Sequence, residues 1–294
     1  MLVGLGEAAY GSVGLAVIFA WFPRAYRATV AGVFLSGAVF GSFLGSAFGG
    51  MIGARHGWRW PLILVGLLGL LLAGAYYILV REAAAESAYA PRRPPFDLKA
   101  LWRALFEQRM MRMSYLGSGL QLFVLGAMTA WIIAFFHRIY RLDVEQAAWA
   151  GGGLLLIGGV GMIACGALSD RLARAAPHRC GQTAVIYCLL TAAFLGLAFQ
   201  LQPGVAQLAL LTVGMFVCAG TVGPAQSMVA DRSSPALAAS TLGVLALANN
   251  LLGLAPGAFV TGLLADRFGI SAALGLMPLI AVAAAGCLWS ASRG

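Results

Sequence analysis

The sequence predicts an all-α membrane protein whose chain crosses the bilayer several times. Hydrophobic residues make up 61% of the 294 residues and charged residues only 10%, whereas a soluble domain carries about 25% charged residues. The mean hydropathy is +0.88. Apolar stretches of roughly 20 residues recur along the chain, and each can cross about 30 Å of hydrocarbon as a helix. The 39 glycines fit this class, because small residues let membrane helices approach closely.

Nine apolar stretches follow one another and are expected to be transmembrane helices. The first lacks the basic start and short apolar core of a signal peptide, so it is counted as a span. Pro224 and Pro256 lie inside the seventh and eighth and are expected to kink them. The nine spans are Val3–Trp21, Thr29–Gly53, Trp60–Val80, Met113–Phe136, Ala147–Leu168, Thr183–Leu201, Ala206–Val229, Leu237–Leu264 and Ser271–Trp289.

One substantial linker, residues 81–112, separates the third span from the fourth. It passes through a proline- and arginine-rich segment, Pro91–Pro95. Apolar residues from Leu98 to Phe106 then recur at helical spacing, opposite Lys99 and Arg103. This pattern predicts a helix that lies on the membrane surface.

The basic residues predict the orientation of the chain. Fourteen of the 19 Lys and Arg fall in alternate loops that include the linker and the C-terminal tail, and five fall in the opposite loops. Because cytoplasmic loops are enriched in Lys and Arg, the linker and the C-terminus are expected to be cytoplasmic and Met1 to lie outside. The expected location is the inner or plasma membrane. The net charge of +9 follows from this bias, so no nucleic-acid partner is expected.

The chain also repeats itself at an offset of 211 residues. Gly32-Val33 corresponds to Gly243-Val244, and Ala47-Phe48 corresponds to Ala258-Phe259. Spans one to three therefore resemble spans seven to nine. Parallel halves of six spans, each built from two three-span repeats, characterise one large class of transporters.

This repeat predicts three regions. Residues 1–80 form the second half of an N-terminal six-helix domain, 81–112 the linker, and 113–294 a complete C-terminal six-helix domain. Nine helices of an expected twelve are then present. We expect in-frame codons for three further spans upstream of Met1.

Glu7 is the only acidic residue inside an apolar span. A carboxylate in hydrocarbon costs several kcal/mol, so such groups usually line a water-filled cavity, pair with a cation or carry protons. Gly11, Gly14 and Ile18 share its helix face at steps of four, three and four. A cavity-facing Glu7 is the favoured interpretation, and a glutamate paired with a structural arginine is the alternative.

Several motifs resemble the major facilitator superfamily. Residues 166–174 read G-A-L-S-D-R-L-A-R and resemble its G-x-L-x-D-R loop signature between helices eight and nine. Trp21-Phe22-Pro23, followed by Arg27 and Gly32, resembles the connection between helices four and five. The chain would then cover helices four to twelve of a major facilitator helical bundle. The helix-five glycine motif of drug–proton antiporters is incomplete, because Ser46 stands where that motif has proline.

Within the superfamily, residues 4–10 (G-L-G-E-A-A-Y) resemble the segment that opens helix four of the Spinster-like branch. Organic-anion and hexuronate symporters have a related G-x-x-E-A stretch followed by W-F-P. The resemblance implies proton coupling through Glu7, with Tyr10 beside it, and transport by alternating access. The Spinster-like branch suggests an amphipathic or lysolipid-type solute, and the symporters suggest an organic anion. Both solute classes remain open.

Two further groups of residues are candidates for function. A charged pair at a cytoplasmic helix end usually braces one helix terminus against another, which predicts a conformational latch formed by Gly166, Asp170, Arg171 and Arg174. The alternative is that these charges serve only as a positive-inside signal. Pro23 and Arg27 belong to the matching loop. Polar residues inside other spans could line a cavity or bond helices together; these are Gln121, Thr129, Gln226, Asn249 and Asn250.

No enzymatic function is expected, since no nucleophile–base pair or metal-ligand spacing occurs in the sequence. The five cysteines lack a CxxC pair, so we interpret them as small packing residues, and we expect no metal and no cofactor. The expected partners are a small organic or lipid-like solute, protons and the bilayer, with the protein acting as a monomer. The alternative is a non-transporting remnant that serves as a membrane scaffold.

Overall fold

The computed structural model describes residues 2–86, 105–176, 179–234 and 237–293. Within these ranges, the side chains of residues 2–10, 12, 79–86 and 175 and most of those from 46 to 54 are not described. The described chain is helical, as predicted. Its helices are α1 (Leu2–Trp21), η1 (Arg24–Tyr26), α2 (Arg27–His56), α3 (Arg59–Glu86), α5 (Arg109–Ile139), α6 (Val144–Ala175), α7 (Arg179–Ala198), α8 (Val205–Gly220), α9 (Val222–Asp231), α10 (Ala238–Ala248), η3 (Asn249–Leu254), α11 (Ala255–Phe268) and α12 (Ile270–Ser292).

Among the described residues, eight helical segments are long and apolar enough to cross a membrane. They correspond to the second to ninth predicted spans, and α1 covers the first. Three of the eight are built from consecutive helices, namely η1 with α2, α8 with α9, and α10 to α11. The all-α membrane fold is therefore confirmed. Most of the predicted surface helix of the linker lies outside the described residues.

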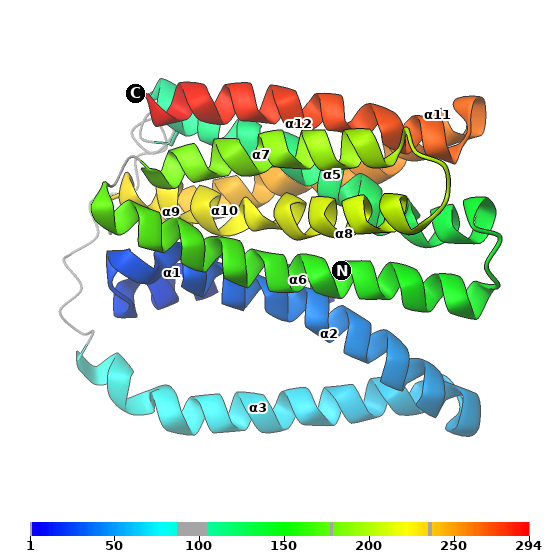
Figure 1. The fold of residues 1–294 in the computed structure, drawn as a ribbon. Helices are drawn as coiled ribbons and strands as arrows, with labels where there is room; N and C mark the ends of the chain where they lie inside the picture. Colours follow the sequence, from blue (N-terminus) through cyan, green and yellow to red (C-terminus); the bar gives the residue numbers. More distant parts are fainter. Residues whose placement is uncertain (1, 87–104, 177–178, 235–236, 294) are drawn as a thin grey trace. The chain divides into compact units, whose positions relative to one another are not determined.

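The chain divides into two compact units, residues 1–39 with 103–294, and residues 40–102. In the smaller unit, the second part of α2 turns into α3 at Gly57, whose φ of +89° favours glycine. In the larger unit, long helices lie side by side along a common direction (Figure 1). Its core includes the fully buried Ile132, Phe135, Met215 and Leu274 from α5, α8 and α12. The first 39 residues belong to this unit, and the predicted boundaries at 80 and 113 stay predictions.

Both prolines predicted to kink a helix lie beside an interruption of regular α-helix. The seventh span changes from α8 to α9 at Thr221. Proline lacks an N–H, so Pro224 cannot donate the helical hydrogen bond to the carbonyl of Gly220, four residues before it. Before Pro256, η3 is a π-helical turn, and the Ala255 N–H bonds the Asn250 carbonyl five residues back. The wider turn leaves room for the proline ring.

The larger unit carries its positive charge at one end. The described residues at the end formed by the start of α5 and the ends of α6, α9 and α12 include nine arginines and three carboxylates. The opposite end has three of each, Arg138, Arg141 and Arg267 with Asp143, Glu145 and Asp266. Under the positive-inside rule, the arginine-rich end is the one expected to be cytoplasmic.

Thiol labelling of intact cells tests this orientation. In a cysteine-free background, Arg138→Cys is expected to react with a membrane-impermeant reagent, because it lies at the end with balanced charge. Arg171→Cys, at the arginine-rich end, is expected to react only after the cells are opened. Both side chains are exposed, so accessibility in the folded protein does not separate them. The reverse pattern would overturn the orientation.

Candidate functional site

The start of α2 is held by a carboxylate from another helix. Asp170, in the last turns of α6, is 2% exposed. Its carboxylate accepts hydrogen bonds from the Ala28 N–H at 3.1 Å, the Thr29 N–H at 2.7 Å and the Thr29 hydroxyl at 2.6 Å. The first N–H groups of a helix have no partner within it and carry partial positive charge. Asp170 therefore caps α2 from across the helix interface.

Two glycines let the backbone of α2 come this close. A Cβ atom on Gly166 of α6 would lie 2.6 Å from the Ala28 carbonyl oxygen. A Cβ on Gly223 of α9 would collide with the same oxygen. Ala28 itself is completely buried. We call Gly166, Asp170 and Gly223 the socket for the start of α2.

An ion pair joins α2 to α9 beside the socket. The Arg27 guanidinium donates to the Asp231 carboxylate. Among the described residues, this is the only ion pair. The Arg27 guanidinium also donates to the Phe19 carbonyl at 3.3 Å and lies 5.4 Å from the centre of the Phe19 ring. Ser227 donates to the second Asp231 oxygen at 3.4 Å. Arg27 thus connects α1, α2 and α9.

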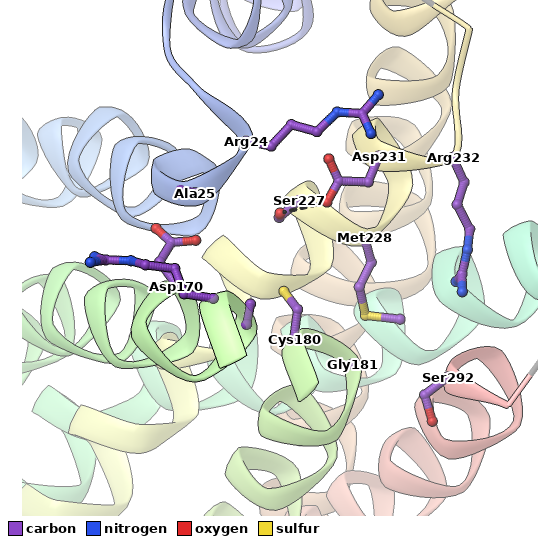
Figure 2. Close-up of a pocket in the computed structure, with 12 residues that line it drawn as sticks. Arg24, Ala25, Asp170, Cys180, Gly181, Ser227, Met228, Asp231, Arg232 and Ser292 are labelled. Atoms are coloured by element: carbon purple, nitrogen blue, oxygen red, sulfur yellow. Dashed lines mark hydrogen bonds between the residues drawn. The ribbon is translucent and has the colours of Figure 1, made fainter. Parts of the chain in front are cut away.

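A hollow of about 600 Å³ opens beside these contacts (Figure 2). It lies where α6, α7, α9 and α12 end or begin. In Figure 2, Asp170 stands on one side and Asp231 on another, with Ser227 between them and Cys180 below. The lining residues are Arg24, Ala25, Asp170, Ala173, Arg174, Cys180, Gly181, Ser227, Met228, Asp231, Arg232 and Ser292.

The sequence profile of the Major Facilitator Superfamily matches residues 1–256. The chain belongs to the major facilitator superfamily. It is 29% identical to the probable L-galactonate transporter of Escherichia coli K12 over 231 residues, which cover 72% of this chain and 50% of the relative. It is 22% identical to the probable sphingolipid transporter spinster homolog 3 of Arabidopsis thaliana, over 91% of this chain and 58% of the relative.

Spinster relatives from animals are also similar. The sphingosine-1-phosphate transporter SPNS2 of Mus musculus is 29% identical over 47% of this chain and 26% of its own length. The suspected Spinster-like similarity is therefore confirmed, alongside similarity to sugar-acid transporters. The chain spans about half the length of the superfamily relatives it matches most broadly.

The structure brings most of the predicted latch together. Gly166 and Asp170 form the socket, and Arg27 lies beside it in the ion pair. The Arg174 guanidinium lies 5.1 Å from the centre of the Tyr26 ring. Pro23 directly precedes η1. Arg171 is exposed and lies outside the set of residues that line the hollow.

Three residues at the site were not predicted from the sequence. Thr29 bonds Asp170, Gly223 packs against Ala28 and Asp231 pairs with Arg27. All three lie far along the chain from the G-x-L-x-D-R motif. One sequence feature could have indicated Asp231. It is an acidic residue at the end of a predicted span, on the side of the membrane where most loop charges are arginines. Thr29 and Gly223 had none, because their contacts depend on how α2, α6 and α9 pack.

The polar candidates for cavity lining do not gather in one place. Gln121 is fully buried and donates to the Thr191 hydroxyl at 3.1 Å and the Cys218 carbonyl at 3.2 Å. Asn249 is buried and accepts from the Ser118 hydroxyl at 2.7 Å. These two bonds join helices within the bundle.

The remaining candidates lie elsewhere. The exposed Thr129 and Asn250 bond backbone carbonyls of their own spans. Gln226 is buried in α9, and its amide oxygen has no hydrogen-bond partner among the residues that the structure describes. Glu7 and Tyr10 belong to α1, but their side chains lie outside the described residues. Their roles stay predictions.

Proposed function

We propose that this protein is a secondary active transporter that moves a small organic or lipid-like solute by alternating access. Membership in the superfamily supports transport. The observation that carries the proposal is the Asp170 carboxylate bound to the first N–H groups of α2. This contact joins helices from before and after the linker at one end of the protein.

Alternating access requires such a contact to form and break. With α2 in the socket, Ala28 is buried and the Asp170 carboxylate has its hydrogen-bond donors. In this proposal, that arrangement is the closed state of this end. Opening it would expose the N–H groups of Ala28 and Thr29 and separate Arg27 from Asp231. Because water can replace each lost partner, the two states can differ by only a few kcal/mol. In this proposal the socket is a latch whose release opens this end to solute.

The names of the relatives suggest two solute classes. The Escherichia coli relative is named for L-galactonate and the animal relatives for sphingosine-1-phosphate. Both compounds carry an acidic group, so we propose an organic anion or an acidic lipid-like molecule. Uptake of each compound into proteoliposomes tests this choice. Exchange of neither compound, by protein shown to be folded, would favour the scaffold alternative.

We further propose that Glu7 couples transport to protons. The support is its place as the lone acid within an apolar span. Glu7→Gln removes the titratable group and keeps the shape. It is expected to abolish solute accumulation driven by a pH gradient while solute exchange at equal pH continues.

Glu145→Gln is the matched control, because Glu145 lies in the exposed first turn of α6. It is expected to accumulate solute as the wild type does. Full gradient-driven accumulation by the Glu7 variant would remove Glu7 from the coupling mechanism.

A further inference from the structure

A second hollow lies at the arginine-rich end, between the start of α5 and the end of α12. Its volume is about 390 Å³. It is lined by Arg109, Met110, Trp289, Ser290 and Arg293. Two arginines face it, and none of the described residues that line it is acidic. The hollow is therefore positively charged, unlike the one beside the socket, which contains Asp170 and Asp231.

The contacts of both arginines are with neutral groups. The Arg109 guanidinium donates to the Ser290 hydroxyl at 3.3 Å, and the Arg293 guanidinium lies 4.3 Å from the centre of the Trp289 ring. Neither arginine forms an ion pair with any part of the chain that the structure describes. A guanidinium has five N–H donors in a planar fork that fits phosphate oxygens. Within the described chain, one Arg109 N–H bonds a neutral hydroxyl and neither guanidinium has a carboxylate partner.

The surface below the hollow is apolar. Leu279, Val282, Gly286 and Trp289 recur at steps of three, four and three on one exposed face of α12. Gly286 has no atom within 4 Å of the position where a Cβ would be, so this part of the face is open. Trp is typical of the membrane–water interface. An apolar track thus leads along α12 to the two arginines.

We propose that this hollow binds the phosphate group of an anionic membrane lipid, whose acyl chains lie along the exposed face of α12. A soluble phosphate compound has no acyl chain that could cover the apolar face of α12. Basic pockets between membrane helices at the cytoplasmic side are suited to anionic headgroups. The inference does not depend on the solute or on proton coupling, since the residues that line this hollow include neither Glu7 nor any residue of the socket.

Lipid retention by the purified full chain tests the proposal. The protein in detergent is mixed with phosphatidylglycerol or phosphatidylcholine, and the bound lipid is counted by native mass spectrometry. The wild type is expected to retain phosphatidylglycerol in preference to phosphatidylcholine. Arg109→Gln with Arg293→Gln is expected to lower phosphatidylglycerol retention by roughly thirtyfold, at an unchanged melting temperature.

Arg138→Gln with Arg267→Gln is the matched control, because both arginines are exposed at the opposite end. It removes the same charge and is expected to retain lipid as the wild type does. Equal retention of the two lipids by the wild type would overturn the proposal without any variant. A loss shared equally by both double variants would show a general charge effect and contradict it. Displacement of phosphatidylglycerol by inorganic phosphate at the same concentration would reject the lipid as the occupant.

Discussion

Replacing Asp170 by alanine is expected to release the start of α2 from α6 and to open this end of the protein to water. The change removes three charge-assisted hydrogen bonds and leaves the buried Ala28 N–H and the half-buried Thr29 N–H without this partner. A loss of about 3 kcal/mol from the closed state is expected, which corresponds to roughly 100-fold more of the open state. Asp170→Asn is expected to have a smaller effect, since its amide oxygen can still accept one bond.

Cys180 reports this opening directly. It lines the hollow beside the socket and is 6% exposed. In a background that retains Cys180 alone, its reaction with a hydrophilic thiol reagent is expected to accelerate strongly in the Asp170→Ala variant. Asp143→Ala is the matched control, because Asp143 also caps a helix, accepting from the Gln146 N–H at 2.7 Å, but at the opposite end. Equal Cys180 labelling in both variants would contradict the role of Asp170.

A single methyl group on Gly166 is expected to have a comparable effect. The alanine Cβ would lie 2.6 Å from the Ala28 carbonyl oxygen. Both atoms belong to backbone-fixed positions, so α2 and α6 must move apart. Such overpacking costs about 2 kcal/mol. Lower melting temperature and faster Cys180 labelling are expected together, because a displaced α2 also loses its bonds to Asp170.

Gly153→Ala is the control for this change. Gly153 lies in the same helix, and no atom lies within 4 Å of its Cβ position. Alanine is favoured over glycine in a helix by about 1 kcal/mol, so this variant is expected to be at least as stable as the wild type. Gly166→Ala with wild-type melting and labelling would show that the close approach of α2 is not needed for the closed end.

The sequence predicted the helices well because a membrane span has a simple requirement. About 20 apolar residues between charged or breaking residues are enough to define it, and the structure has helices over every predicted span. Pro256 was expected to produce a kink, and the structure has a π-helical turn before it. The difference is physical, because a proline frees one carbonyl and the chain can adjust either by bending or by widening a turn.

The site was predicted in part, and the division has a clear cause. Asp170 was expected to brace a helix terminus because the motif around it is local. Its partners could not be found, since Thr29 is 141 residues away and uses only a backbone N–H and a small hydroxyl. For Gln121, the sequence singled out the residue but could not decide its role. A polar residue in a span is compatible with a cavity or with bonds between helices, and only the packing around Thr191 and Cys218 distinguishes the two.

Amide hydrogen exchange at Ala28 and Thr29 tests the central claim most directly, because these N–H groups lie in the first turn of α2 and bond Asp170 across the helix interface. The wild type is expected to exchange both amides slowly. Asp170→Ala is expected to speed their exchange by about 100-fold, while Asp143→Ala leaves it unchanged. Equal exchange at these two amides in the wild type and the Asp170→Ala variant would contradict the claim that Asp170 holds the start of α2.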